Sequence, residues 1–247
     1  MPDQSSLLAR LSSFLPQTPI GVLKPLAALL LAANFRNLPL VWHLYTARVT
    51  VAGAIWRRAR DTTYQTLDKD ARGEAIAQDF FAPRVLKWRV TPGDCDANMH
   101  LNNATYYIFA NFSRDDLLCR SGIGYFNADP RSQGRLILGG TELAFLKEIP
   151  LGRLFVVKSR WVTFNEKWFI VETRFEDPSG SILYTIGHAK MIVKRGGRTV
   201  SPDQALKDMG VPDRYWKRPV PSCCQAIMES NKTPEFHRDI DAFVSRL

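Results

Sequence analysis

A polar segment near the middle of the chain holds the side chains best suited to catalysis. It runs from Gly93 to Asn103 and reads GDCDANMHLNN. Carboxylate and imidazole groups are common general bases and proton carriers in enzymes. The segment also precedes a predicted helix, whose first backbone N–H groups have no acceptor within the helix and can stabilise an oxyanion. Asp96 therefore lies about where a base or nucleophile for acyl hydrolysis is needed.

The cysteines do not indicate a metal site or a disulfide framework. The sequence has four of them, Cys95, Cys119, Cys223 and Cys224, with no CxxC pair and no zinc-ligand spacing. We expect reduced thiols in an intracellular protein. Cys95 is flanked by two acids that disfavour its thiolate, so a cysteine nucleophile is not expected. No metal or cofactor is predicted.

Other common site signatures are missing from the sequence. The glycine pairs do not form a GxGxxG or P-loop spacing, and no serine lies in a GxSxG context. The formal net charge of +9 favours acidic partners, namely nucleic acid, an anionic membrane face or a phosphate-bearing small molecule. A basic surface without a dedicated role is the alternative. Because no RNA-binding or zinc-finger signature accompanies the charge, nucleic acid is not expected.

The elements around the polar segment predict one long helix and several antiparallel strands. Apolar residues recur at helical spacing over 104–119, and Gly122 and Gly124 would end that helix. Alternating or β-branched runs, separated by turns at Asn165-Glu166 and 177–180, predict strands at 84–91, 136–147, 154–164, 167–175 and 181–194. A curved antiparallel sheet wrapped around the helix buries both, which is the α+β hot-dog fold.

Three regions follow from this pattern. Residues 1–80 are an apolar, helical N-terminal extension broken by Pro16, Pro19, Pro25 and Pro39; residues 82–195 form the hot-dog domain; and residues 196–247 form an irregular C-terminal extension with short helices. Within residues 20–60, the run 25–33 is too short to span a bilayer, and His43 and Arg48 interrupt the run 38–56. Membrane association and packing on the main domain both stay open. The first residues lack a signal-peptide pattern, so we expect a cytoplasmic or membrane-associated protein that is not secreted.

Two motifs carry a family resemblance. Residues 90–107, VTPGDCDANMHLNNATYY, resemble the D-x-D-x-x-x-H-x-N-N-x-x-Y signature of hot-dog acyl thioesterases. Residues 165–175, NEKWFIVETRF, are similar to a strand of the THEM6-like and 4-hydroxybenzoyl-CoA thioesterase-like subfamily. The resemblance covers residues 82–195. It implies hydrolysis of an acyl-CoA or acyl-carrier-protein thioester without a cofactor, by a homodimer or higher homo-oligomer.

The same resemblance assigns residues to roles. Asp96 corresponds to the nucleophile or base of 4-hydroxybenzoyl-CoA thioesterases. Asp96, Asn98 and His100 also match the D-x-N-x-H of plant acyl-carrier-protein thioesterases, in which Asn98 would orient the thioester and His100 would carry a proton. Glu148 matches a further glutamate of those enzymes only loosely. Asn103 and Tyr106 are assigned to substrate binding.

Each of these residues has a structural alternative. Asp94 is expected to bond nearby backbone N–H groups, and the alternative role of Asp96 is to cap the helix. His100 can stabilise the loop through a backbone carbonyl. Asn102 and Asn103 are expected to cap the helix and fix the bend. His188 lies in a strand with apolar alternate residues, which is typical of a core or interface histidine.

Two other functions stay open beside hydrolysis. One is a hot-dog protein that binds or tailors an acyl or polyketide intermediate without hydrolysing it. The other is a membrane-associated module whose hot-dog domain serves dimerisation.

Overall fold

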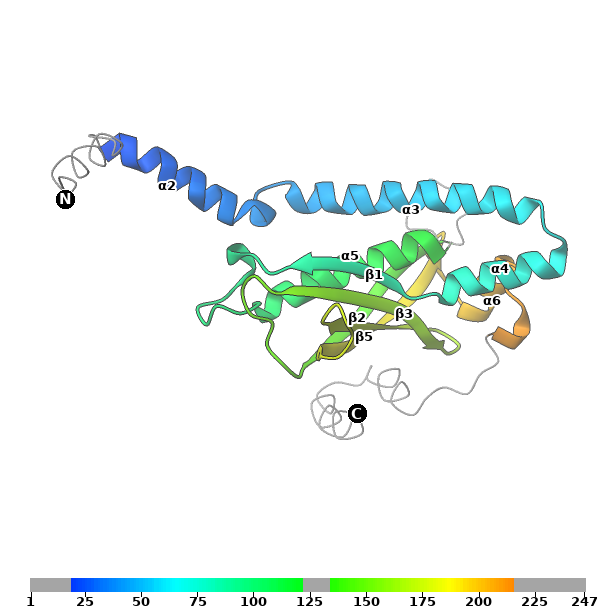
Figure 1. Ribbon diagram of the computed structural model, residues 1–247. Coiled ribbons are helices and arrows are strands. Elements are labelled where there is room, and N and C mark those ends of the chain that lie inside the picture. Colours follow the sequence, from blue (N-terminus) through cyan, green and yellow to red (C-terminus); the bar gives the residue numbers. More distant parts are fainter. Residues whose placement is uncertain (1–18, 122–133, 216–247) are drawn as a thin grey trace.

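A long helix, α5 (Asn103–Ser121), lies against the inner face of a curled antiparallel sheet (Figure 1). The computed structural model describes residues 19–121 and 134–215. The strand order is β1-β3-β4-β5-β2, with β6 paired to β5. The strands are β1 (Arg84–Arg89), β2 (Arg135–Phe145), β3 (Leu154–Phe164), β4 (Phe169–Glu176), β5 (Leu183–Arg195) and β6 (Arg198–Val200). The predicted hot-dog fold is confirmed.

Two apolar clusters fill the space between α5 and the sheet. One lies towards the start of α5 and contains Phe109, Phe155 and Phe175; the other lies towards its end and contains Leu117 and Phe169. All five side chains are almost fully buried. Alternate residues of β3 and β4 reach this face because the side-chain period of a strand is two. Burial of each such side chain contributes about 1.5–3 kcal/mol to folding.

Helix α3 (Val41–Gln65) covers the side of α5 that faces away from the sheet (Figure 1). The two helices are in close contact at Gly53, where an added Cβ would lie 2.3 Å from the Cβ of Cys119. Helix α4 (Lys69–Phe81), capped by Asp68, and helix α6 (Pro202–Asp208), capped by Ser201, pack at the far end of the sheet. The N-terminal extension is therefore helical as predicted, over the residues that are described.

The first described helix, α2 (Pro19–Ala33), projects beyond the body of the molecule (Figure 1). Pro25 lies inside this helix, so its predicted role as a breaker is wrong. A proline removes only its own N–H from the helical bonds and disturbs the preceding turn, and α2 continues through it. Among the helices of residues 19–121 and 134–215, none has both the length and the apolar character that crossing a membrane requires.

The predicted strands agree closely with the structure, with two differences. The Gly139-Gly140 step shifts the register between β2 and β5 without ending β2. The sheet also continues past 195, because β6 pairs with β5 after a turn at Gly196 and Gly197. The predictions for Pro16, Gly122, Gly124 and residues 216–247 lie outside the described residues.

Candidate active site

A tight turn brings Asp96 and His100 together between β1 and α5. The backbone N–H of Asp96 donates to the carbonyl of His100 at 3.1 Å, and the N–H of Met99 donates to the carbonyl of Asp96 at 3.1 Å. Met99 takes the left-handed conformation, with φ of 61°, that closes the turn. His100 Nδ1 then lies 3.5 Å from Asp96 Oδ2. The two candidate residues therefore lie close to each other.

A second loop pairs with this turn and adds a carboxylate. The N–H of Leu101 donates to the carbonyl of Ile149 at 2.8 Å, and the N–H of Leu151 donates to the carbonyl of Met99 at 3.0 Å. This ribbon places Glu148 Oε1 3.7 Å from His100 Nε2. The imidazole ring therefore lies between two carboxylates, one at each nitrogen. A His in this position can pass a proton between its two neighbours.

The remaining contacts of the turn are hydrogen bonds between side chains and the backbone. Asp96 Oδ1 accepts the backbone N–H of Asn98 at 2.9 Å, and Asn98 itself is exposed. His100 Nδ1 also lies 3.4 Å from the carbonyl oxygen of Leu101, at the limit of a hydrogen bond. Asp96 does not cap α5. The cap is Asn102, whose Oδ1 accepts the N–H of Ala104 at 2.8 Å, so its predicted structural role is confirmed.

Asp94 is a buried support of the turn. Only 2% of this residue is exposed. One of its oxygens, Oδ2, accepts the N–H of Thr91 at 2.8 Å and the Thr91 hydroxyl at 2.6 Å, as the sequence predicts. The same oxygen lies 2.6 Å from Arg36 Nη1. Arg36 also donates to the carbonyl of Arg89 at 3.0 Å, and its guanidinium stands 5.4 Å from the Trp88 ring centroid. No sequence motif pointed to Arg36.

The two residues assigned to substrate binding lie in different surroundings. Tyr106 is 2% exposed, with its ring 5.1 Å from that of Phe145 and 5.0 Å from that of Phe175. Burial raises the pKa of Tyr106 to about 12, so its phenol stays protonated. Asn103 is exposed at the first position of α5, close to the turn. Binding of substrate by either residue stays a prediction.

The cysteine in the turn is a poor nucleophile. Burial, followed by the charges of Asp94 and Asp96, raises the pKa of the Cys95 thiol. A raised pKa leaves less thiolate at neutral pH. Within residues 19–121 and 134–215 there is also no group of three or more His, Cys, Asp or Glu side chains that could hold a metal ion.

His188 lies in the sheet, away from the turn. It is 3% exposed, with Nδ1 4.0 Å from Glu142 Oε1 on β2 and Nε2 3.9 Å from Glu172 Oε2 on β4. Burial lowers the pKa of His188 to about 4, whereas burial raises the pKa of Glu142 to about 7. His188 is therefore a neutral, buried histidine, as the sequence predicts.

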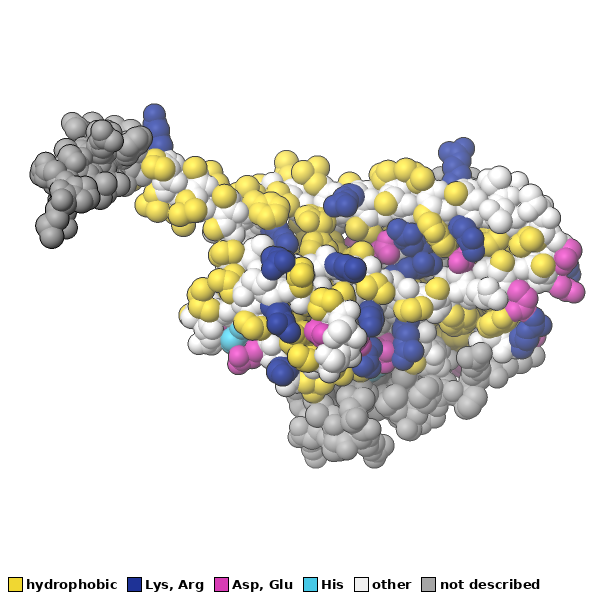
Figure 2. Space-filling view, in the orientation of Figure 1, with side chains coloured by type: hydrophobic (Ala, Val, Ile, Leu, Met, Phe, Trp, Pro, Cys, Tyr) yellow, Lys and Arg dark blue, Asp and Glu magenta, His cyan; other side chains and the backbone are white. Residues whose placement is uncertain are grey.

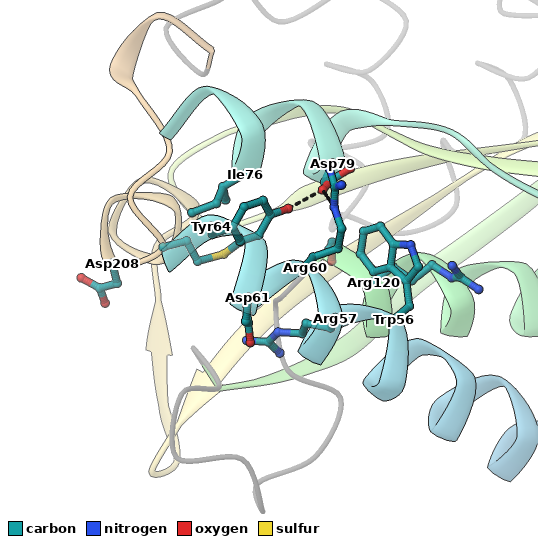
Figure 3. Close-up of a pocket in the computed structure, with 11 residues that line it drawn as sticks. Trp56, Arg57, Arg60, Asp61, Tyr64, Ile76, Asp79, Arg120 and Asp208 are labelled. Atoms are coloured by element: carbon teal, nitrogen blue, oxygen red, sulfur yellow. Dashed lines mark hydrogen bonds and ion pairs between the residues drawn. The ribbon is translucent and has the colours of Figure 1, made fainter. Parts of the chain in front are cut away.

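A pocket of about 360 Å³ lies at the opposite end of α5 from His100, between α3, α4 and α6 (Figure 3). Ionic groups of its lining are bonded to neighbouring side chains. Figure 3 shows the hydroxyl of Tyr64 directed at Asp79, to which it donates, and Arg60 Nε lies 2.6 Å from the same carboxylate. Asp208 pairs with Arg195 at 3.1 Å. These pairs hold the helices together, so the turn at Asp96 and His100 remains the candidate active site.

Comparison with known proteins finds similarity to thioesterases. A family model described as the thioesterase-like superfamily matches residues 90–242. A probable thioesterase of Saccharomyces cerevisiae is 29% identical over 131 residues, which are 53% of this chain and 56% of that protein. The thioesterase poxG of Penicillium oxalicum is 26% identical over 213 residues, covering 72% of this chain and 68% of that one. Protein THEM6 of Danio rerio is 28% identical over 160 residues, which are 61% of this chain and 76% of that protein.

Solved structures with a similar fold cover about half of the chain. A thioesterase of Thermus thermophilus, crystallised with coenzyme A and zinc, has a TM-score of 0.43 and 20% identity, covering 56% of this chain and 96% of that one. The probable thioesterase YbaW of Escherichia coli has a TM-score of 0.42 and 17% identity, covering 51% of this chain and 95% of that one.

Proposed function

The chain belongs to the thioesterase-like superfamily, and from this we propose that it hydrolyses an acyl thioester at Asp96 and His100. The observation that carries the proposal is the position of the His100 ring, 3.5 Å from Asp96 and 3.7 Å from Glu148. A general base, a proton carrier and a second carboxylate therefore meet at one solvent-accessible turn. The relatives named as thioesterases support the same chemistry.

The proposed reaction uses water as the nucleophile. Asp96 takes a proton from the water, whose oxygen attacks the carbonyl carbon of the thioester. As the carbon–sulfur bond breaks, His100 gives a proton to the leaving thiolate and recovers one from Asp96. The products are a carboxylic acid and a free thiol. Glu148 orients the imidazole ring through Nε2.

The developing oxyanion needs a hydrogen-bond donor. The N–H of Ala104 donates to the Asn102 side chain and that of Thr105 to the Asn102 carbonyl. We therefore propose the backbone N–H of Asn103, the first residue of α5, as the donor. This assigns Asn103 to substrate binding through its backbone, and it leaves Tyr106 as part of the wall behind the acyl group.

The acyl carrier is proposed to be coenzyme A or an acyl-carrier protein. Both present phosphopantetheine, and the net charge of +9 favours phosphate-bearing ligands. No cofactor takes part in the proposed mechanism. We also propose that the protein is cytoplasmic or membrane-associated, and that residues 20–60 make the membrane contact.

A homodimer is proposed through the edge of the sheet. β2 is the last strand in the order β1-β3-β4-β5-β2, so one of its edges has no strand partner among residues 19–121 and 134–215. Its residues Ile137 and Leu138 are exposed. An apolar, 11-residue edge strand can add a strand from a second copy.

Thiol release from a panel of acyl-CoAs tests the proposed function. The wild-type chain is expected to release thiol above the background rate, and Asp96→Asn is expected to reduce that rate to near background. Asp70→Asn, at an exposed position of helix α4, is the matched control and should retain full activity. Equal rates for wild type, Asp96→Asn and a blank would exclude hydrolysis. Acyl-CoA binding without turnover would then favour the binding or tailoring function, and dimerisation without binding would favour the dimerisation module.

A further inference from the structure

Helix α2 exposes apolar side chains on several sides of its axis. Every residue from 23 to 32 is exposed. Leu29, Leu30 and Leu31 are consecutive and therefore point in three directions around the helix. A groove on another protein covers one stripe of a helix, whereas a helix that is apolar all round requires apolar surroundings on several sides. A lipid layer provides such surroundings.

The exposed side of α3 extends the same apolar surface. Leu44, Val51 and Ile55 are exposed on α3, and their spacing of seven and four residues places them on one face. Figure 2 shows hydrophobic side chains over α2 and along the outer edge of α3. α2 is 15 residues long, which corresponds to about 22 Å and is shorter than the hydrocarbon core of a bilayer. A helix of this length can bury its apolar sides in one leaflet without crossing the bilayer.

The charges of this region match an anionic surface. Residues 19–60 contain no Asp or Glu, and all their charged residues are basic. Lys24, Arg48 and Arg58 are exposed on the two helices. Basic side chains beside an apolar surface bind the negative headgroups of the membrane. Charge complementarity therefore identifies an anionic phospholipid membrane as the partner.

The end of α2 is attached directly to the candidate active site. The short helix η1 (Phe35–Asn37) follows α2, and Asn37 Nδ2 donates to the carbonyl of Gly93 at 2.7 Å. A Cβ added at Gly93 would lie 2.9 Å from the carbonyl oxygen of Ala33, so the two segments touch. The Arg36–Asp94 ion pair fixes the same contact at 2.6 Å. A membrane that holds α2 therefore lies close to the turn that carries Asp96.

Apolar side chains also surround that turn. Met99 and Leu151, joined through the backbone, are both exposed next to His100 and Glu148. They offer an apolar path for an acyl chain beside the reacting groups. A site that is tethered at a membrane surface and has an apolar rim suits substrates dissolved in that surface.

We infer that α2 and the exposed face of α3 dock on an anionic phospholipid membrane, and that the active site takes long-chain acyl thioesters that partition into it. The substrate half of this inference rests on the proposed function. The docking half rests on α2 and α3, and it deepens the proposed membrane association through residues 20–60. The two halves therefore need separate measurements.

Vesicle flotation tests the docking. The full chain is mixed with phosphatidylcholine vesicles, with or without phosphatidylserine, and the bound fraction is measured. The wild type is expected to float with the anionic vesicles, and Leu29→Gln/Leu30→Gln/Leu31→Gln to bind at least about tenfold more weakly. The control, Val85→Gln/Leu154→Gln, changes two apolar residues that are exposed outside α2, α3 and the β2 edge, and it should float like the wild type. A wild type that stays in solution, or an α2 variant that floats equally well, overturns the docking.

Hydrolysis in the presence of the same vesicles tests the substrate. Anionic vesicles are expected to raise the rate on a long-chain acyl-CoA severalfold for the wild type but not for the α2 variant. The rate on a water-soluble short-chain acyl-CoA should be equal for both proteins, which also shows that the variant is folded. Hydrolysis without any effect of vesicles overturns the inferred substrate. No hydrolysis under any condition overturns the proposed function and the inferred substrate, while flotation still decides the docking.

Discussion

Glu148 Oε1 lies 3.7 Å from His100 Nε2, across the ribbon that joins the two loops. The residues are far apart in the sequence, and their contact depends on the backbone bonds of Leu101 and Leu151. The side chain of Glu148 is 76% exposed and that of Asp96 29%. The two carboxylates that flank one imidazole thus differ in their access to water. We expect them to contribute differently to catalysis.

Asp96→Asn is expected to lower kcat by about 10²–10⁴, the range for loss of a general base. Glu148→Gln is expected to lower kcat by about tenfold, because an exposed carboxylate is screened by water and acts only through His100. Steady-state thiol release measures both. Asp70→Asn should match the wild type. A Glu148→Gln enzyme with unchanged kcat, or one as impaired as Asp96→Asn, would contradict the assigned roles.

The sequence predicts the strands and the central helix well because their signals are local. Alternation along β3, the turn at Asn165 and the helical spacing in α5 each depend on neighbouring residues. The candidate site is only partly predictable. Asp96 and His100 lie four residues apart, whereas the place of Glu148 depends on pairing between two loops that have no periodic pattern. Pro25 misled the prediction because a proline weakens a helix without always ending it.

Arg36→Gln is expected to destabilise the fold by about 3 kcal/mol. The change leaves the buried Asp94 carboxylate without its cationic partner, and breaking one side of a buried ion pair has this effect. Unfolding in urea, followed by far-UV circular dichroism, gives the free energy of unfolding. Asp94→Asn in the Arg36→Gln background should recover part of the loss, because the uncompensated charge is then removed. Additive losses in the double variant would show that the two residues do not interact.

The contact of Arg36 with Asp94 could not be predicted from the sequence. It lies 58 residues before Asp94, in a short 3-10 helix after an apolar segment. Nothing in its neighbourhood indicates that its guanidinium reaches a buried carboxylate. Its role follows from the way η1 packs on the loop that begins at Pro92, and this packing is a property of the folded chain.

Glu142→Gln is expected to make the free energy of unfolding fall more steeply as the pH is lowered. The folded pKa of Glu142 is raised to about 7, so this residue stabilises the fold as pH falls from about 7 to 4.5. The folded pKa of His188 is lowered to about 4, so this residue destabilises the fold as pH falls from about 6.5 to 4. In the wild type the two effects oppose each other. Without Glu142, the variant should be more stable than the wild type at pH 8 and should lose stability steadily below pH 6.5.

Urea midpoints measured from pH 8 to pH 4.5 test this dependence. Glu172, Arg160 and Lys190 also face this part of the sheet and remain unchanged in the variant. His188→Gln is the complementary variant and should gain stability relative to the wild type as pH falls. Parallel curves for all three proteins would mean that neither residue titrates as described.

Gly53→Ala is expected to destabilise the protein by about 1–3 kcal/mol, the usual effect of overpacking. The added methyl group would lie 2.3 Å from the Cβ of Cys119, so α3 would have to move away from α5. Thermal unfolding measures the change. Ala52→Ser, on the exposed side of α3, should have little effect. The clash is with the Cβ of Cys119, which an alanine retains and a glycine lacks. Adding Cys119→Gly to Gly53→Ala should therefore relieve the clash, whereas adding Cys119→Ala should not.

Ile137→Lys/Leu138→Lys is expected to convert a homodimer into monomers. Both residues are exposed on β2, and charged side chains on an edge strand oppose its pairing with another strand. Sedimentation velocity at several protein concentrations gives the oligomeric state. Val85→Lys alters an exposed residue of β1, the opposite edge of the sheet, and should remain dimeric. Dissociation by Val85→Lys alone would place the interface at β1, and a monomeric wild type would exclude the proposed assembly. Because Ile137 and Leu138 lie on β2, away from the turn at His100, activity that falls with dimer dissociation would show that the partner subunit supports the active site.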